Sequence, residues 1–250
     1  MSLKDKVILI TGASRGIGRT LALAFAAEEA IVVTSARTAK AGTNDAPGSL
    51  RETVEEIRRE GGRAHSFPCD VASEPQVRKL IERTIATVGP VDVVINNAGI
   101  NTSGTITNLS AKDFDKVLAV NLRGVFLVCK YVIPGMKQRH QGNIINITSR
   151  SAIWDTENDL IYGASKAALD RFTVNLSLET KPYNIAVNAL GPGLIASMMT
   201  RNHDPLLDIW GRLPEPPEVV VPAALWIATQ DASTFTGRIV HRDEFQKTWP

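Results

Sequence analysis

The chain has 250 residues, of which 44% are hydrophobic and 22% charged, the composition of a soluble globular protein with a large core. Its 28 basic and 26 acidic residues are spread along the sequence, which argues against a basic patch for nucleic acid. No linker or block of like charge divides the chain. We therefore expect a single domain over residues 1–250.

The sequence gives no clear signal for a leader peptide, a membrane span or a metal. The first apolar segment breaks at Thr11-Gly12, too early for a signal peptide, and no uninterrupted apolar run reaches membrane-spanning length. Cys69 and Cys129 are the only cysteines, which suits reduced thiols in a cytoplasmic protein. The four histidines lie far apart without ligand spacing, so no metal site is expected.

A β-α-β pattern opens the chain. Val7–Ile10 is a continuous apolar run, typical of a strand covered on both faces, and a helix runs from there to about Glu29. The turn between them is glycine-rich and reads Thr11-Gly-Ala-Ser-Arg-Gly-Ile-Gly18. Glycines let a backbone approach a pyrophosphate, and the free amides of the helix N-terminus attract its charge. Taken alone, the same turn is also consistent with a tight turn that binds nothing.

Strands and helices then alternate, which predicts an α/β fold. Strands are expected at 31–33, 64–67, 91–95, 144–148, 185–190 and 237–240, and helices at 50–60, 74–88, 113–139, 162–179 and 219–228. A long polar loop at 38–49 is expected beside the adenosine end of a cofactor. An excursion near 194–217 has several prolines and weak periodicity, as expected of a segment that covers a ligand.

Candidate chemistry is concentrated between residues 143 and 166. A strand there ends in Thr148-Ser149, and Tyr162 and Lys166 stand four residues apart, on one face of the next helix. A nearby cation lowers the pKa of a phenol, so we expect Lys166 to make Tyr162 a better proton donor and acceptor, with Ser149 bonded to the reacting oxygen. The alternative is an amphipathic helix with a solvated lysine.

Two asparagine positions allow more than one interpretation. Asn96-Asn97-Ala98-Gly99 follows an apolar strand and is consistent with a simple turn or a strand-end cap. Asn121 stands among apolar residues of a long helical pattern, and a buried asparagine must be hydrogen-bonded. It is therefore either a structural tie or part of a polar network beside the site.

Together these motifs resemble the short-chain dehydrogenase/reductase family, in its branch of about this length. The match spans essentially the whole chain and consists of Thr11-Gly-x-x-x-Gly-Ile-Gly18, Asp70, Asn96-Asn97-Ala98-Gly99, Asn121, Ser149, Tyr162-x-x-x-Lys166 and Pro192-Gly193. The resemblance implies a Rossmann-type, doubly wound, mostly parallel seven-stranded sheet with helices on both faces. It also implies an enzyme that interconverts a carbonyl and a secondary alcohol by hydride transfer.

The resemblance further implies a role for each matching residue. Tyr162 is the general acid or base, Ser149 orients the substrate oxygen, Lys166 binds the nicotinamide ribose, and Asn121 holds a water that links Lys166 to solvent. Asp70 meets the adenine, Asn97 the adjoining ribose and Ile195 the carboxamide. The full set of expected cofactor contacts is Gly12, Ser14, Arg15, Gly16, Ile17, Gly18, Arg37, Asp70, Val71, Asn97, Ala98, Gly99, Tyr162, Lys166, Pro192, Gly193, Ile195 and Ser197.

The charges of the side chains at the end of the second strand predict which nicotinamide cofactor is preferred. An acidic residue there would bind a ribose 2′-hydroxyl and repel a 2′-phosphate, but the segment reads Thr34-Ser-Ala-Arg37. Arg15 stands in the glycine-rich turn, so two guanidinium groups are expected at the same corner of the nucleotide. We therefore expect NADP(H) to be favoured over NAD(H). The alternative is that one or both arginines point to solvent or pair with an acid.

Two departures from the family pattern affect what can be transferred. Ser197 stands where many members have threonine, and Val240-His-Arg-Asp-Glu-Phe245 replaces a common Asp-Gly-Gly segment. This ending and the long loop are more loosely similar to a hydroxysteroid-dehydrogenase-like subgroup, whose substrates we do not transfer. The ending also puts the family's C-terminal subunit contacts in doubt. A homo-oligomer, either dimer or tetramer, is still expected, with the helices near 113–139 and 162–179 pairing across subunits.

The sequence leaves the substrate open. Apolar residues in the stretches 152–160 and 194–213 favour a partly apolar carbonyl or alcohol, and they are equally suited to packing a lid or a subunit interface. They are Ile153, Trp154, Met198, Met199, Leu206, Leu207 and Trp210.

Two alternative functions are a catalytically silent nucleotide-binding or scaffold protein, and a sugar-nucleotide epimerase or dehydratase. The intact catalytic set disfavours the first, and the glycine spacing and lack of a further domain disfavour the second.

Overall fold

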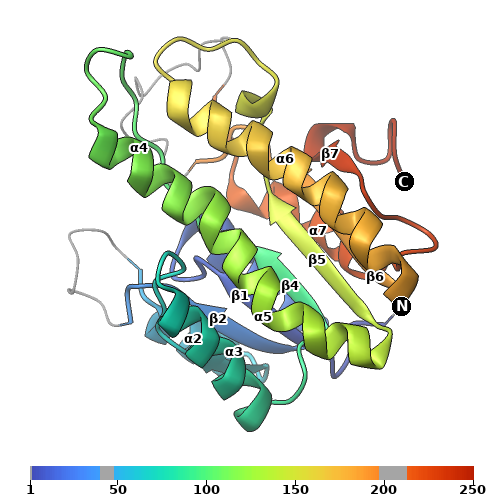
Figure 1. Cartoon of the computed structure of the whole chain (residues 1–250). Coiled ribbons are helices and arrows are strands. Elements are labelled where there is room, and N and C mark those ends of the chain that lie inside the picture. Colours follow the sequence, from blue (N-terminus) through green and yellow to red (C-terminus); the bar gives the residue numbers. More distant parts are fainter. Residues whose placement is uncertain (1, 40–47, 197–212) are drawn as a thin grey trace.

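The computed structural model describes residues 2–39, 48–196 and 213–250. Its seven strands form one sheet in the order β3-β2-β1-β4-β5-β6-β7, and every neighbouring pair is parallel (Figure 1). The strands are β1 Val7–Thr11, β2 Ile31–Ser35, β3 Arg63–Ser66, β4 Val93–Asn96, β5 Gly142–Ile147, β6 Ile185–Gly191 and β7 Ile239–His241. The expected Rossmann-type sheet is confirmed, and it is parallel throughout.

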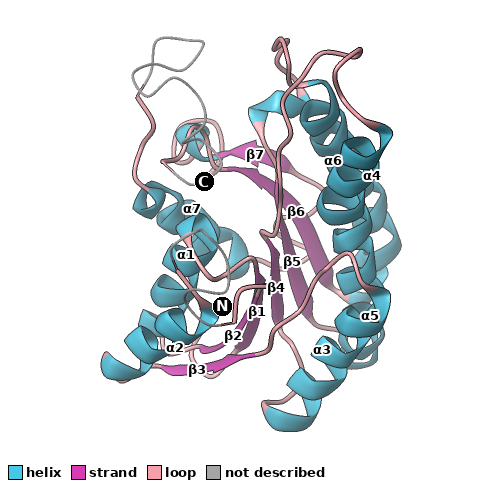
Figure 2. Ribbon diagram, turned by 90° about the vertical axis from the view of Figure 1, so that its left-hand side faces the viewer, coloured by secondary structure: helices cyan, strands magenta, loops and turns pink. Residues whose placement is uncertain are grey.

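Helices cover both faces of the sheet, as Figure 2 shows, with α1, α2 and α7 on one side and α3, α4, α5 and α6 on the other. The helices are α1 Gly16–Ala27, α2 Leu50–Arg59, α3 Glu74–Thr87, α4 Ala111–Leu118, α5 Gly124–Arg139, α6 Leu160–Thr180 and α7 Val221–Ala228. Short 3-10 turns lie at η2 Arg150–Ala152, η3 Lys181–Tyr183, η4 Pro217–Val220 and η5 Arg242–Glu244. Because each face is covered, the strands read as continuous apolar runs.

Two apolar clusters, one on each face, make up the core. The first joins the strands to α1, α2 and α7 around Leu21, Phe25 and Ile227. The second joins them to α3, α5 and α6 around Ile81, Leu127 and Leu169. Alternate residues of each strand supply the two clusters, as the twofold repeat of a strand requires. One sheet therefore organises a single domain.

The helical pattern expected from 113 to 139 begins two residues earlier and contains an irregular turn. Residues Ala119–Arg123 form a π-helical turn between α4 and α5, so Asn121 sits in the widened segment. A single π turn inside an α-helix often marks a functional site. By length and composition, Ala111–Arg139 would be apolar enough to cross a membrane. Half of its most apolar window is buried against the rest of the domain, which makes it a core helix here.

Buried asparagines form a polar layer inside the sheet that periodicity did not predict. Asn96 Nδ2 donates to Asn146 Oδ1 at 2.9 Å, and Asn146 Nδ2 donates to Thr173 Oγ1 of α6 at 2.8 Å. Asn143 donates to the carbonyl oxygens of Ile227 and Gln230 at the end of α7. Buried amides are stable only when they are paired in this way. They therefore link β4, β5 and the flanking helices in a fixed register.

The residues after β7 return to the domain rather than ending in the common glycine pair. Trp249 packs against Phe235 and Phe245, with ring centroids 6.0 and 4.8 Å away, and its Nε1 donates to His241 O at 3.1 Å. Trp226 of α7 packs edge-on against Phe235 at 4.9 Å. This aromatic cluster anchors the segment 242–249 beside the ends of β6 and β7.

The asparagine layer gives a test of stability. Asn146→Ala removes one acceptor and one donor from a dry interior and leaves Asn96 and Thr173 each short of a partner. We expect a loss of about 2 to 4 kcal/mol in the free energy of unfolding, measured by urea denaturation. Asn175→Ala, on the exposed face of α6, should change that free energy by no more than about 0.5 kcal/mol. Equal losses in the two variants would contradict the structural role of Asn146.

Candidate active site

The residues singled out from the sequence gather at one edge of the sheet. Parallel strands all end on the same side, so the segments after β1, β4, β5 and β6 become neighbours there. These segments carry the glycine-rich turn, Asn97–Gly99, Ser149 and Pro192–Gly193. The N-terminal half of α6, with Tyr162 and Lys166, lies over the end of β5 (Figure 1).

The glycine-rich turn fits a phosphate group. A side chain on Gly12, whose φ is +70°, would place its Cβ 2.8 Å from Asn97 Nδ2, and a Cβ on Gly18 would overlap the same amide. No side chain caps the N-terminus of α1, and no acidic residue lies in its first turn. The helix amides and their dipole are therefore left for an anion. The same turn is expected to bring Ser14, Gly16 and Ile17 to the cofactor.

Asn97 holds this turn in place. Its Nδ2 donates to Thr11 O at 2.9 Å and to Gly12 O at 3.2 Å, and Thr11 Oγ1 accepts from the amides of Asn97 and Ala98 at 3.1 Å. Both amide hydrogens of the side chain are thus used by β1 and its turn. The structure shows Asn97 as a structural tie, with only its carbonyl oxygen left for the ribose contact expected from the resemblance.

Tyr162 and Ser149 are neighbours at the end of β5. Ser149 accepts a hydrogen bond from the amide of Ser151 at 3.1 Å, which fixes the turn after β5. Burial raises the pKa of Tyr162 to about 12; the nearby Ser149 hydroxyl lowers it and the charge of Asp159 raises it. This direction is opposite to the one expected from the sequence. The phenol is protonated at neutral pH, and Lys166 does not lower its pKa here.

Lys166 is almost completely buried, and its ammonium donates to the carbonyl oxygen of Ile147 at 2.7 Å. Its Nζ lies 5.6 Å from the centroid of the Tyr162 ring. Lysine and tyrosine therefore face the same space, as their spacing predicted. Because the ammonium points to the end of β5, its charge acts weakly on the phenol oxygen.

Asn121 is a structural tie. Its side chain accepts from Ile100 N at 2.9 Å and donates to Ile100 O at 2.9 Å and to Ser165 Oγ at 3.0 Å. These bonds fasten the π turn to the segment after β4 and to α6. The same side chain also lies beside the site, since a Cβ on Gly99 would be 3.5 Å from Asn121 Oδ1 and 3.8 Å from Lys166 Nζ. Both amide hydrogens are used, so a water would have to bond the side-chain carbonyl or the backbone.

The adenosine side of the site contains Arg15, Arg37 and Asp70. Arg15 Nη2 donates to Thr38 Oγ1 at 3.2 Å, so its guanidinium reaches the segment that carries the exposed Arg37. Neither arginine forms an ion pair with any acid among the described residues. Asp70 Oδ1 accepts from Ala72 N at 3.0 Å and shapes the turn that contains Val71. The two arginines are thus brought together at the carboxyl end of β2.

The segment after β6 is held in place by hydrogen bonds and an ion pair from residues that were not predicted from the sequence. Arg242 donates to Pro192 O at 3.3 Å and pairs with Glu215, whose amide donates to Leu194 O at 2.9 Å. Ile195 and Glu215 form a parallel bridge, so both described ends of the excursion lie together. Gly193 has a φ of +85° and lies under the Arg242 guanidinium. Arg242 therefore supports the predicted carboxamide loop.

A second arginine that the sequence analysis did not predict to be part of the site lies next to Ser149. Arg150 pairs with Asp243 and Glu244 at 2.8 Å each and lies over the Trp154 ring at 5.0 Å. Burial lowers the pKa of Arg150, but the two carboxylates outweigh it and raise the pKa overall. No short motif connects residues 93 apart, so the only available signal was the unusual acidic ending itself.

Several predicted residues lie outside the described part of the chain. Ser197 is one, together with the apolar candidates Met198, Met199, Leu206, Leu207 and Trp210 and most of the loop at 38–49. Ile153 is described and is 63% exposed, which leaves it available for a substrate or an interface. Among the described residues, no three His, Cys, Asp or Glu side chains come together as metal ligands.

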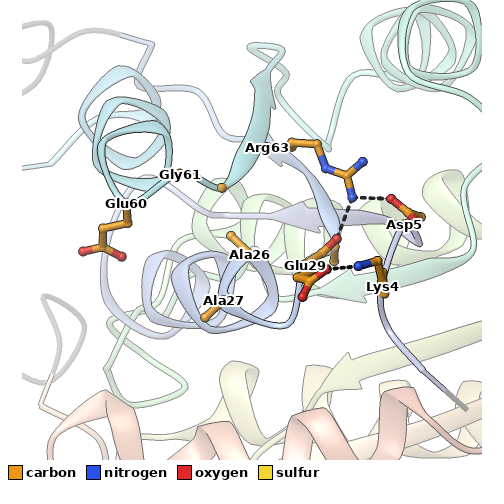
Figure 3. A pocket seen from close by; sticks show the side chains of 10 residues that line it. Lys4, Asp5, Ala26, Ala27, Glu29, Glu60, Gly61 and Arg63 are labelled. Carbon is orange, nitrogen blue, oxygen red and sulfur yellow. Dashed lines mark hydrogen bonds and ion pairs between the residues drawn. The ribbon is translucent and has the colours of Figure 1, made fainter.

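A hollow lies at the opposite edge of the sheet. It has a volume of about 490 Å³ and is lined by residues that include Lys4 and Asp5 before β1, Glu29 before β2 and Arg63 at the start of β3 (Figure 3). Lys4 pairs with Glu29 and Arg63 with Asp5, so these charges satisfy one another. The hollow is distant from the candidate catalytic residues, and we do not assign it a role.

Comparison with known proteins identifies the family. A family model described as short chain dehydrogenase matches residues 6–206. The chain belongs to the short-chain dehydrogenase family. A protein of Thermotoga maritima named as an uncharacterized oxidoreductase is 36% identical to this short-chain dehydrogenase, over 97% of this chain and 98% of its own.

Two further relatives extend the comparison. A 3-oxoacyl-[acyl-carrier-protein] reductase of the same organism is 32% identical over 97% of this chain and 98% of its own length. The crystal structure of a gluconate 5-dehydrogenase from Burkholderia cenocepacia, in complex with NADP and tartrate, has a TM-score of 0.84 and 29% identity. It covers 96% of this chain and 94% of its own. This short-chain dehydrogenase is thus an oxidoreductase with a Rossmann-type fold.

Proposed function

We propose that this protein interconverts a carbonyl and a secondary alcohol with NADP(H), using Tyr162 as the general acid or base. The observation that carries the proposal is the placement of three side chains at the end of β5: the Ser149 hydroxyl acts on the buried Tyr162 phenol and lowers its pKa, and Lys166 Nζ lies 5.6 Å from the centroid of the Tyr162 ring. The cofactor would supply the hydride. Tyr162 would give its proton to the oxygen that becomes an alcohol, and Ser149 would hold that oxygen in place.

Proton transfer in each direction follows from the state of Tyr162. With a pKa of about 12 the phenol carries its proton at neutral pH and is ready for carbonyl reduction. Alcohol oxidation needs the phenolate, which the nearby Ser149 hydroxyl favours and burial opposes. Rates of oxidation should therefore rise with pH over a wider range than rates of reduction. Lys166 would hold the nicotinamide ribose, and Gly12 to Gly18 the pyrophosphate.

Tyr162→Phe tests the assignment. The variant keeps the ring but removes the only proposed proton donor, so turnover should fall by roughly two to four orders of magnitude. The dissociation constant of the cofactor should stay within about threefold, because the phenol is a minor part of that binding site. Steady-state kinetics and cofactor fluorescence measure the two quantities. Tyr183→Phe, in the turn η3 that follows α6, is the matched control, and near-normal turnover in Tyr162→Phe would refute the role.

The competing proposal is a catalytically silent nucleotide-binding or scaffold protein of the same fold. Such a protein would bind the cofactor yet turn over no carbonyl or alcohol. The complete set of Asn121, Ser149, Tyr162 and Lys166 favours the enzyme. A screen of carbonyl compounds and alcohols for cofactor turnover separates the two proposals and also identifies the substrate, for which Ile153 and Trp154 favour a partly apolar small molecule.

The preference for NADP(H) is supported by Arg15 and Arg37 at the carboxyl end of β2. If each guanidinium contributes about 1.5 kcal/mol to binding the 2′-phosphate, the two together give a preference on the order of a hundredfold. The bond from Arg15 to Thr38 is compatible with this role, because a guanidinium has further donors. The NADP bound to the Burkholderia gluconate 5-dehydrogenase agrees with it.

Arg37→Asp tests the cofactor preference. Replacing the guanidinium by a carboxylate should reduce kcat/KM for NADPH by roughly a hundredfold and leave that for NADH within about threefold. Arg59→Asp makes the same charge change at the remote end of α2 and should alter neither value. Equal kcat/KM values for the two cofactors in the unsubstituted protein would show that these arginines do not recognise the phosphate.

Association into a dimer or tetramer is a further expectation of this proposal. Phe126 and Leu178 are 46% and 69% exposed on α5 and α6, which cover the same face of the sheet (Figure 2). Burying them against a second copy would remove apolar surface from water. Sedimentation velocity should show a species of at least two chains at micromolar concentration, and Leu178→Glu should weaken it. A monomer throughout that range would contradict the expectation.

A cytoplasmic location fits the same proposal. Burial raises the pKa of Cys69 to about 11 and that of Cys129 to about 12, so both thiols stay protonated and unreactive. They form no disulfide.

A further inference from the structure

A buried carboxyl group lies directly behind the candidate catalytic residues. Asp170 is four residues after Lys166 on α6, so both side chains leave the same face of the helix. Only 7% of Asp170 and 4% of Lys166 is exposed to solvent. The end of β5 covers them with Ile147, whose carbonyl binds the lysine, and with Thr148.

The Asp170 carboxyl contributes little to the stability of the fold through hydrogen bonds. Asp170 Oδ1 is buried without a hydrogen-bond partner among the described residues. The Thr148 hydroxyl lies near the carboxyl and lowers its pKa, but Thr148 Oγ1 also lacks a partner in bonding geometry. An acid buried with an unmatched oxygen destabilises a protein unless another group compensates for it. Nearby Lys166 is a cation that can do so.

Charge links the two residues. Burial lowers the pKa of Lys166 to about 8, and Asp170 is the group that acts against this shift. Burial raises the pKa of Asp170 to about 6, while Thr148 and Lys166 lower it. Between these values both groups are charged, and in a dry interior their attraction is weakly screened.

Among the described residues, Tyr162 is the ionisable group next to this pair: its ring centroid lies 5.6 Å from Lys166 Nζ, and its phenol is protonated at neutral pH. Neither β5 nor β6 carries an ionisable side chain. The titratable groups on the other elements against α6 act on neither Lys166 nor Asp170; they include Lys112, Asp113, Asp115 and Lys116 of α4, and Arg123, Arg150, Lys181, Tyr183 and His241. The lysine and the aspartate therefore form an isolated pair, although the structure has no direct ion pair between them.

We propose that Asp170 is the buried counter-charge of Lys166, a positioning residue that keeps the ammonium charged and directed toward the end of β5. It acts through Lys166 and has no contact with the reacting atoms. The inference rests on the proposed function for its consequence, which is that cofactor binding depends on a charge supplied from behind the site. The lysine–aspartate pair itself can be tested without any cofactor.

The first experiment measures the lysine directly. Protein labelled with ¹³C-lysine is titrated by NMR, and the Lys166 signal is assigned from its loss in Lys166→Arg. In Asp170→Asn the midpoint of that signal should fall by roughly one pH unit, because an opposite charge nearby has been removed. Asp170→Leu should show a similar fall. An unchanged midpoint in Asp170→Asn would overturn the proposal.

The pair of variants separates charge from hydrogen bonding. If the carboxyl served only as a hydrogen-bond partner, Asp170→Asn would behave like the unsubstituted protein and Asp170→Leu would not. If it served only to pack α6, both variants would unfold more easily without moving the lysine midpoint. Either result contradicts a counter-charge. Glu179→Gln removes a carboxylate from the exposed end of the same helix and should leave the midpoint unchanged.

The stability of Asp170→Asn is a second test, because it should not fall although the lysine midpoint does. Because the pKa of Asp170 is raised on folding, its contribution to stability is full below about pH 4 and is lost as the pH rises through about 6. Asp170→Asn should thus be at least as stable as the unsubstituted protein at pH 7, measured by thermal unfolding. Failure of both variants to fold would also overturn the proposal, which requires the carboxyl to be dispensable for folding.

The last experiment connects the pair to function. The dissociation constant of NADPH is measured by fluorescence from pH 6 to 9 in the unsubstituted protein and in Asp170→Asn. Binding should weaken as the pH rises through the lysine midpoint, and in the variant this should occur roughly one pH unit lower, a difference of about fivefold at pH 8. No NADPH binding at any pH would refute the proposed function, whereas identical pH curves would refute only the role of Asp170.

Discussion

The hydrogen bond from the Lys166 ammonium to the carbonyl of Ile147 joins helix α6 to the end of strand β5, and the geometry of the candidate site depends on it. Ile147 stands two residues before Ser149, and Lys166 stands one helical turn after Tyr162. One bond therefore sets the distance between the strand that carries the serine and the helix that carries the tyrosine. An ammonium in an apolar interior needs an acceptor and a counter-charge. The acceptor is the Ile147 carbonyl at the end of β5, and Asp170, one helical turn further along α6, is the proposed counter-charge.

Around this bond, polar groups are placed where the sheet would otherwise be purely apolar. Asn96 and Asn146 bond each other across β4 and β5, Asn97 bonds the glycine-rich turn, and Asn121 bonds the segment after β4. Apolar packing alone permits small shifts between helices and strands, whereas an amide with every hydrogen committed permits one position only. The amides thus fix the carboxyl edge of the sheet with the accuracy that a reaction between small groups requires.

Much of this architecture was predictable from the sequence, because a continuous apolar run identifies a buried strand and a periodic apolar pattern identifies a helix. The seven strands and the helices between them were found within a few residues of their positions. The direction of the Tyr162 pKa was not predictable, since spacing shows that Lys166 is close but not how deeply the phenol is buried. The partner of Asn121 is Ile100, which lies 21 residues earlier and leaves no pattern in a helix.

The ion pairs of Arg150 link the turn after β5 to residues about 93 positions later in the chain. During synthesis, the strands up to β5 emerge and can pair long before Asp243 and Glu244 exist. The serine turn thus stays without its acidic partners, and the loop after β6 without Arg242, until β7 has been made. A nascent chain can therefore form most of the sheet before the ion pairs of Arg150 and Arg242 are in place. The ion pairs that support the candidate catalytic residues can therefore form only after the last strand has been made.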